Sequence, residues 1–400
     1  MTTPGHPPPT SAPRPAPPRQ RTRDDILELI TTAGELTRVD LVARTGFPRS
    51  TVTNAVSQLL TDGLIEEFES SGKGPGSGSG RPPTKLRPAS SNGYVAAVDF
   101  GHSHVHTAIA DHARTVLAEE RREIPVDLKA TEALDSAAEM LVRLRDRHGI
   151  ETLDAVVTGV PGPLDLRSGL VRSATILSSW VGLSPAQELQ RRLGMPVHAE
   201  NDALLGAYGE LMHGAGRELS DFLYVKVSHG IGACPVINGE PYRGARGVAG
   251  EIGHTNIAGR SELCRCGQRG CLEAVVSVDT VRQQIAHAHP GQRVDGVALE
   301  QFDDPMTRRI LEEAGRLLGR VLADIGNILN PAAVVIGGDL GTAGPALLAG
   351  LRSSIDRYAS AATAADTQVV RAGLGPRAEL VGALSMAAAR AGRRALARKS

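Results

Sequence analysis

The chain has 400 residues, more than one compact core usually holds, so two or three domains are expected. Its 44 Lys and Arg balance 44 Asp and Glu, which excludes a uniformly basic nucleic-acid coat or an acidic tail protein but leaves room for a local basic site. The four cysteines are too few for a disulfide scaffold, and the lack of an apolar run of roughly 20 residues or a hydrophobic leader predicts a cytoplasmic protein.

The first part of the chain is rich in proline. Residues 1–20 contain eight prolines and almost nothing that would be buried, which predicts a disordered Pro-rich arm. A helix with an apolar stripe that includes Ile26 and Ile30 is expected next. Asp24 or Asp25 would open this helix.

Two further short helices are expected to follow. Thr37 is a candidate N-cap with Asp40 three residues later, and Gly46 would end that helix. The third helix would start near Pro48 and end at Asp62-Gly63. Its inward-facing positions are Val52, Val56, Leu59 and Leu60. Three short helices in succession predict a helix-turn-helix unit.

A strand and an extended segment come after these helices. Residues 64–69 favour a strand, so residues 21–69 are predicted to be a winged helix-turn-helix DNA-binding domain. Residues 70–92 are expected to form a wing and linker, because their Gly/Ser stretch is poor in packing groups and their prolines favour extended backbone.

Residues 93–400 alternate β-rich and helical segments. The β-rich runs are YVAAVDF, HTAIAD, TVLAEE, DAVVTGV, PVHAE, FLYVKV, CPVING and AVVIGG. Helical stretches lie between them, for example 131–147, 307–329 and 378–398. This alternation predicts an α/β domain long enough for two lobes. Two Gly-rich turns, one near the start of each lobe, indicate a duplication.

The third helix of the N-terminal unit has an acid-free polar face. The candidate DNA-binding residues are Arg49, Ser50, Thr51, Thr53, Asn54 and Ser57 on the helix, and Arg81 and Lys85 in the following segment. Arg49 would read guanine and Asn54 adenine in the major groove, while Arg81 would lie in a minor groove. The alternative is a helical module whose polar face is only solvated.

Three of the four cysteines stand close together. Cys264, Cys266 and Cys271 form a C-x-C-x4-C pattern, and His254 lies ten residues upstream. Three thiolates and an imidazole complete a closed tetrahedral set, which predicts a structural Zn²⁺ site. The alternative is three unrelated buried cysteines. Cys234, outside the cluster, is expected to be a small packed residue.

Two longer motifs carry a family resemblance. They are GVAGEIGH, from residue 247, and CRCGQRGCLE, from residue 264. With the N-terminal unit they resemble the ROK (repressor, open reading frame, kinase) family of sugar kinases and sugar-responsive regulators, including repressors that respond to xylose, N-acetylglucosamine or glucose. The resemblance implies a two-lobed actin/hexokinase-like (ribonuclease H-like) α/β domain preceded by a winged helix-turn-helix domain.

The resemblance also implies a sugar site. Its residues would be Gly162, Asn201, Asp202, Glu251, His254 and Glu273. Asp202 stands at the family's general-base position for phosphoryl transfer. His254 would be both zinc ligand and sugar contact, and would thereby connect sugar binding to the metal loop.

The phosphate-binding turns of the family's kinases are altered in this chain. His102 stands where the first turn usually has its second glycine, and His229 replaces a threonine of the second turn. A ring at position 102 would obstruct the close approach of a phosphate, and His229 would be mostly neutral at pH 7 from its ordinary pKa of about 6.5. No catalytic activity is therefore expected. The alternative is that either histidine donates a hydrogen bond to a phosphate.

These features together predict a sugar-responsive transcription regulator that acts as a repressor and binds operator DNA as a homodimer or a dimer of dimers. Sugar entry between the lobes would change the spacing of the two DNA-reading helices and shift operator affinity by about 1–3 kcal/mol. Two rivals remain at this point: an active ATP-dependent sugar kinase with a DNA-binding appendage, and a DNA binder that does not respond to sugar.

Overall fold

The structure is a computed structural model that describes residues 18–61, 64–69, 84–88, 93–172, 177–294 and 296–399. The chain divides into two compact units: Met1–Ser91 together with Ala395–Ser400, and Asn92–Arg394. Most of the predicted arm, residues 1–17, lies outside the described residues. In the part of the chain that the structure describes, no helix has the length and apolar character that crossing a bilayer requires.

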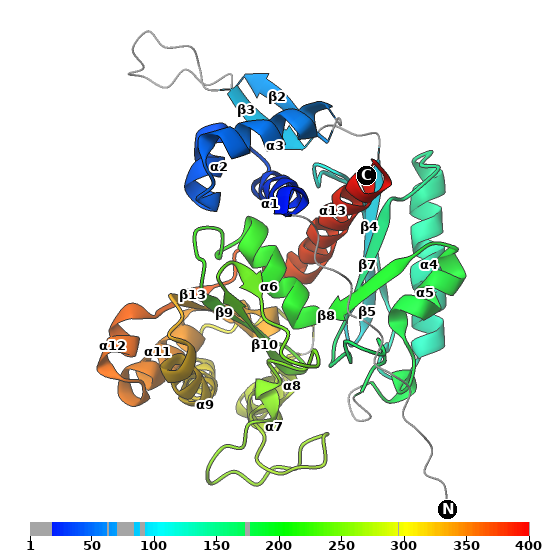
Figure 1. Ribbon diagram of the computed structural model, residues 1–400. Helices are drawn as coiled ribbons and strands as arrows, with labels where there is room; N and C mark the ends of the chain where they lie inside the picture. Colours follow the sequence, from blue (N-terminus) through cyan, green and yellow to red (C-terminus); the bar gives the residue numbers. More distant parts are fainter. Residues whose placement is uncertain are drawn as a thin grey trace, which may run out of the picture. The chain divides into compact units, whose positions relative to one another are not determined.

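The first unit begins with helices α1 (Pro18–Ala33), α2 (Arg38–Thr45) and α3 (Arg49–Thr61) (Figure 1). The predicted second and third helices are confirmed. Thr37 caps α2 in a capping box with Asp40, and Gly46 ends it in the left-handed region at φ 67°. The expected start of α1 at Asp24 or Asp25 is wrong, because the helix already begins at Pro18. Proline suits a first helical turn, where its missing N–H would have no intrahelical partner.

A three-stranded antiparallel sheet completes the first unit. Its strands are β1 (Leu36–Thr37), β2 (Ile65–Glu69) and β3 (Thr84–Pro88), in the order β1-β3-β2. The strand expected at 64–69 is confirmed as β2, and part of the segment expected to be wing and linker forms β3. The buried core under the sheet includes Ile26, Ile30, Leu41, Val56, Leu59 and Leu86.

Two five-stranded sheets of the same topology form the second unit. One consists of β4 (Tyr94–Phe100), β5 (His104–Asp111), β6 (Val116–Glu123), β7 (Ala155–Val160) and β8 (Val197–Asn201). The other consists of β9 (Phe222–Val227), β10 (Ile231–Ile237), β11 (Glu240–Pro241), β12 (Ala333–Gly337) and β13 (Gln368–Arg371). Their orders, β6-β5-β4-β7-β8 and β11-β10-β9-β12-β13, correspond strand by strand. The two predicted lobes and their duplication are thus confirmed.

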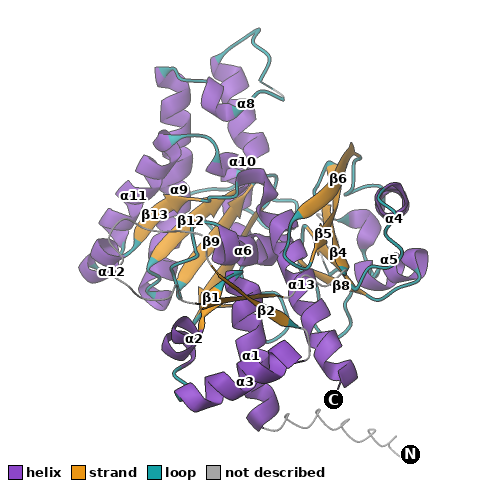
Figure 2. Cartoon of the chain, turned by 90° about the horizontal axis from the view of Figure 1, so that it is seen from above, coloured by secondary structure: helices purple, strands orange, loops and turns teal. Residues whose placement is uncertain are grey.

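Helices cover both sheets. They are α4 (Ala130–Arg147), α5 (Pro185–Leu193), α6 (Asp202–His213), α7 (Leu272–Val276), α8 (Val278–Ala288), α9 (Pro305–Leu329), α10 (Gly338–Gly341), α11 (Pro345–Tyr358), α12 (Ala361–Asp366) and α13 (Ala378–Lys399). Helices α4 and α5 pack on the first sheet, and α8, α9 and α11 pack on the second (Figure 2). The three long helices expected from the sequence correspond to α4, α9 and α13.

Helices α6 and α13 share one core with both sheets. This core contains residues of β4, β5 and β7 from the first lobe and of β9, β10 and β12 from the second. Two glycines let the helices approach closely: a Cβ at Gly209 would collide with the carbonyl oxygen of Ala378, and one at Gly382 with that of Leu205. Helix α13 therefore joins the lobes beside the point where β8 runs into α6.

Candidate functional site

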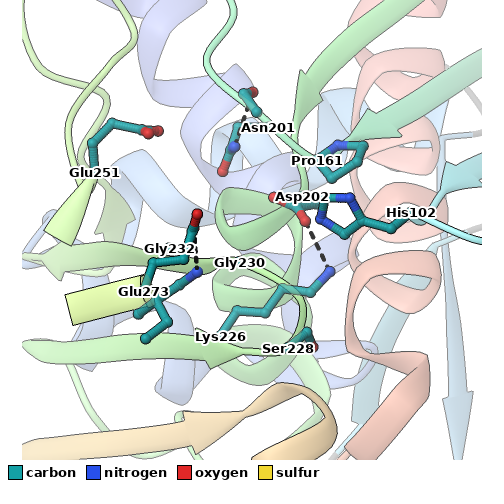
Figure 3. Close-up of a pocket in the computed structure, with 12 residues that line it drawn as sticks. His102, Pro161, Asn201, Asp202, Lys226, Ser228, Gly230, Gly232, Glu251 and Glu273 are labelled. Atoms are coloured by element: carbon teal, nitrogen blue, oxygen red, sulfur yellow. Dashed lines mark hydrogen bonds and ion pairs between the residues drawn. The ribbon is translucent and has the colours of Figure 1, made fainter. Parts of the chain in front are cut away.

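A cavity that is partly open to solvent is lined by residues of both lobes (Figure 3). Its lining residues are His102, Pro161, Gly162, Asn201, Asp202, Lys226, Ser228, Gly230, Ile231, Gly232, Glu251 and Glu273. Of the six residues expected to bind sugar, five line this cavity and His254 does not.

Asn201 and Asp202 lie where β8 runs into α6. Asn201 caps the helix, because its Oδ1 accepts a hydrogen bond from the Leu204 N–H at 3.1 Å, while its Nδ2 donates to the Gly162 carbonyl at 3.1 Å. Both ends of the Asn201 amide are therefore fixed. The Gly162 carbonyl in turn fixes the wall of the first lobe against this junction.

Asp202 is held by a partly buried lysine. Its Oδ1 accepts from the Ala203 N–H at 2.7 Å and its Oδ2 from Lys226 Nζ at 2.8 Å (Figure 3). Lys226 Nζ also lies 3.2 Å from Glu379 Oε1, in the first turn of α13. Burial opposes the charge of Lys226, but Asp202 and Glu379 outweigh it and hold the pKa of Lys226 well above its usual value. Burial raises the pKa of Glu379 to about 7, against the opposing effect of Lys226.

Lys226 and Glu379 were not among the site residues predicted from the sequence. A lysine between Val225 and Val227 in an otherwise apolar strand was the available signal, since lysine is rarely buried without a partner. Nothing in the local sequence indicates that Glu379 is that partner, because their contact depends on how α13 packs between the lobes.

Glu251 and Glu273 supply the remaining carboxylates of the cavity. Glu273 Oε2 accepts from the Ile231 N–H at 3.2 Å, and Glu273 Oε1 lies 3.6 Å from Arg265 Nη2. Burial raises the pKa of Glu251 to about 7, and the charges of Asp202 and Glu273 add to this. The cavity thus gathers three carboxyl groups.

The predicted metal ligands come together. One ligand atom from each of His254, Cys264, Cys266 and Cys271 lies within 4.8 Å of all the others. Cys264 Sγ is 3.8 Å from His254 Nδ1, and Cys266 Sγ is 3.7 Å from Cys271 Sγ. Sulfurs about 2.3 Å from a tetrahedral ion would be about 3.8 Å apart, so the cluster fits a metal ion.

Positive-φ glycines shape the metal loop. Gly270 has a φ of 72°, and a Cβ there would lie 2.6 Å from the Arg260 carbonyl oxygen.

The other ring nitrogen of His254, Nε2, lies 3.9 Å from Glu251 Oε2. His254 therefore borders the cavity through Glu251, and a direct sugar contact by His254 remains a prediction.

His102 and His229 each lie within hydrogen-bonding distance of a carboxylate. His102 Nδ1 is 2.9 Å from both Asp127 oxygens, and His229 Nδ1 is 2.9 Å from Asp279 Oδ2. The two rings meet edge to face with centroids 5.4 Å apart. The expectation that His229 is mostly neutral is revised, because the Asp279 hydrogen bond raises the pKa of His229.

The predicted polar face of α3 is exposed. Arg49, Ser50, Thr53, Asn54 and Ser57 are exposed and Thr51 is partly exposed, while Val52, Ala55, Val56 and Leu59 are buried on the opposite side. The Thr53 hydroxyl donates to the Arg49 carbonyl at 2.8 Å.

The basic segment after α3 is partly neutralised. Lys85 Nζ pairs with Glu35 Oε2 at 3.0 Å, and Arg87 Nε pairs with Glu66 Oε1 at 2.6 Å. Arg81 lies outside the described residues.

Comparison with known proteins identifies the second unit. Residues 95–390 match the ROK family. The chain belongs to the ROK family. The resemblance expected from the glycine and cysteine motifs is thereby confirmed.

Curated ROK relatives resemble nearly the whole chain. The xylose repressor of Bacillus subtilis is 27% identical over 366 residues, which cover 90% of this chain and 93% of that protein. The DNA-binding transcriptional repressor Mlc of Escherichia coli is 25% identical, with 85% of this chain and 86% of that protein covered. The dual regulator NagC of Escherichia coli is 27% identical, with 89% of each covered.

Solved structures of regulators and kinases share the fold. A ROK family transcriptional regulator, a homologue of Escherichia coli Mlc, aligns with a TM-score of 0.76 at 22% identity and covers 95% of this chain. A ROK glucokinase from Streptomyces griseus, with glucose and AMPPNP bound, aligns with a TM-score of 0.66 at 27% identity. It covers 74% of this chain and 99% of its own length. The predicted actin/hexokinase-like fold is confirmed.

Proposed function

We propose that this chain is a DNA-binding transcription regulator, acting as a repressor, whose two-lobed domain binds a sugar and thereby alters operator affinity. The observation that carries the proposal is the extent of the match. The xylose repressor covers 90% of this chain, whereas the glucokinase, at nearly its full length, covers 74%. The kinase thus lacks a counterpart for a segment about as long as the N-terminal unit.

The exposed face of α3 would enter the major groove. Arg49 can donate two hydrogen bonds to a guanine edge, and Asn54 can donate to adenine N7 and accept from the adenine N6 amino group. Ser50 and Thr51 at the helix start supply hydroxyls for phosphates. Thr53 and Ser57 continue the same face. Lys85 would exchange its Glu35 partner for a phosphate, and Arg81 would add a minor-groove contact. In a homodimer two such helices would read two half-sites.

The arrangement around Asp202 supports a receptor without kinase activity. A general base must accept a proton from the attacking hydroxyl. Both oxygens of Asp202 already accept hydrogen bonds, Oδ2 from Lys226 Nζ at 2.8 Å and Oδ1 from the Ala203 N–H at 2.7 Å, which restricts their access to a hydroxyl proton. The imidazole of His102 also lines the cavity at the altered first turn.

The His254, Cys264, Cys266 and Cys271 cluster would hold a structural Zn²⁺. Three thiolates and one imidazole use all four tetrahedral positions, so no position is left for a reacting water. The ion would fix the loop that carries Glu251 on one side and Glu273 on the other. Arg265, between two of the cysteines, donates to the His229 carbonyl at 2.8 Å and so extends this support to the second turn.

One experiment tests the proposal directly. Purified protein is used to select genomic DNA fragments, and selected fragments are then challenged with a panel of free sugars. We expect one enriched sequence family and release or tightening by one sugar. The same preparation is assayed for ATP-dependent sugar phosphorylation. Turnover that disappears in Asp202→Asn would make the protein a kinase instead, and no sugar effect on any selected fragment would remove the sugar response.

A further inference from the structure

Carboxyl groups outnumber lysine and arginine side chains in the lining of the cavity. Asp202, Glu251 and Glu273 line it, and among the described lining residues Lys226 is the only lysine or arginine. Lys226 Nζ is already shared between Asp202 at 2.8 Å and Glu379 at 3.2 Å. A phosphate group entering this cavity would therefore meet like charge without a free lysine or arginine to offset it, and such contacts cost several kcal/mol at an interface. Sugar hydroxyls, in contrast, donate well to carboxylates.

Three backbone N–H groups that flank the two turns also have partners within the protein. The Gly101 N–H donates to the His104 carbonyl at 2.9 Å, and the Ser228 N–H donates to the Gly230 carbonyl at 2.9 Å. The Ile231 N–H donates to Glu273 Oε2 at 3.2 Å. In the second turn a carboxylate therefore takes a donor that would otherwise be available to an anion.

The ring of His102 reaches into the cavity and is fixed there (Figure 3). Its Nδ1 is held at 2.9 Å by both oxygens of Asp127, and its edge-to-face contact with His229 limits its rotation. A Cβ placed on Gly230, across the cavity wall, would be 4.0 Å from His102 Nε2. His102 thus takes up space at the turn and presents one ring nitrogen, Nε2, to a ligand.

We propose that the cavity selects an uncharged sugar and rejects the phosphate monoester of the same sugar, with His102 as a specificity-determining residue. This inference rests on the proposed sugar response and specifies the chemical class of the effector. The carboxyl groups accept hydrogen bonds from the sugar hydroxyls, and His102 Nε2 makes a further hydrogen bond to the sugar. The same ring fills space that a phosphate substituent needs.

The test compares matched pairs of ligands. Glucose, N-acetylglucosamine and xylose are each measured beside their own phosphate monoester, by calorimetry and by release of the selected operator. We expect one free sugar to bind at least about 100-fold more tightly than its phosphate. A phosphate ester that binds as tightly as the free sugar, or more tightly, overturns the inference while leaving the proposed sugar response intact. If no member of any pair binds, the proposed sugar response fails and this inference fails with it.

Variants distinguish the contribution of His102 to ligand preference from effects on the folding of the protein. His102→Ala should reduce the preference for the free sugar about tenfold, because one hydrogen bond to the sugar is lost and space opens for phosphate. Asp127→Asn, which keeps the ring but weakens its support, should give a smaller reduction. His148→Ala, at an exposed histidine, is the control and should not change the preference. The ratio of two affinities is insensitive to a loss of folded protein, since both ligands sample the same folded fraction. An unchanged ratio in His102→Ala would refute the role of His102.

Discussion

The polar residues of the cavity and those of the α3 face are held in different ways. In the cavity, Asn201 has a partner at each end of its amide, and Asp202 has one at each oxygen. On α3, the described residues provide no hydrogen bond or ion pair to the side chains of Arg49, Asn54 or Ser57. One set is preorganised by its own fold, and the other is left free.

This difference fits the two proposed ligands. A small sugar gains affinity when the groups that receive it are already fixed, since less ordering is lost on binding. A helix face that reads DNA has its register fixed by phosphate contacts, so its side chains need no support from their own unit. Substitutions in the second unit should therefore change stability, whereas substitutions on the α3 face should change only DNA affinity.

The largest effect is expected when a metal ligand is removed. Cys266→Ser should abolish zinc binding and cost on the order of 10 kcal/mol of local folding free energy, because binding of a structural zinc contributes that much to the folding of its loop. Metal content by mass spectrometry and sugar binding by calorimetry should fall together, while operator binding survives. Cys234→Ser, at a buried cysteine outside the cluster, is the control and should keep one zinc per chain. A variant that loses zinc yet binds sugar normally would separate the loop from the cavity.

The second test removes the lysine that holds Asp202. Lys226→Met leaves Asp202 and Glu379 as buried carboxyl groups without their shared cation, which should destabilise the protein by about 3–5 kcal/mol. Unfolding in urea measures this loss. Lys129→Met breaks an exposed pair with Glu132 and should cost less than about 1 kcal/mol. Equal small losses in both variants would mean that the cavity groups are no better fixed than a surface pair.

The third test concerns the exposed polar face of α3. Asn54→Ala should weaken operator binding by about 1–3 kcal/mol through loss of a base contact, while stability in urea stays within about 0.5 kcal/mol. Binding to operator and to random DNA is measured at one salt concentration. Gln190→Ala, at an exposed position of α5, is the control for both measurements. Equal losses on operator and random DNA would contradict base recognition by Asn54.

Much of the second unit follows from sequence patterns. The short β-rich runs indicate the strands of both sheets, and the C-x-C-x4-C spacing gathers three of the metal ligands within one loop. The cavity residues required the family resemblance, because Gly162, Asp202 and Glu273 are far apart in the sequence and individually ordinary. Local signals were sufficient wherever a single segment makes its own structure.

The contacts that the sequence did not predict all join separate segments. Lys226 meets Glu379 only because α13 packs between the lobes. Lys85 meets Glu35 only because β3 pairs with β1, and Asp279 raises the pKa of His229 only because α8 begins beside the second turn. No periodicity within one segment encodes such partners, so charges that looked free in the sequence proved to be paired.

The smallest effect expected is a pH dependence within the second unit. Burial lowers the pKa of His213 to about 4, with smaller effects from Arg114 and Arg217, and its Nε2 lies 2.9 Å from Ser385 Oγ on α13. In the unfolded chain the pKa returns to about 6.5. Between these values the unfolded state binds more protons, so the contribution of His213 is present above about pH 6.5 and is lost as the pH falls toward 4.

His213→Gln removes this titration. Its melting temperature should therefore fall less than that of the wild type between pH 7 and pH 5, whatever the other groups contribute. His148→Gln, at an exposed histidine, is the matched control and should keep the wild-type slope. If His213→Gln and the wild type lose stability in parallel, the histidine is protonated at little cost. The packing between α6 and α13 would then be looser than the fixed cavity groups require.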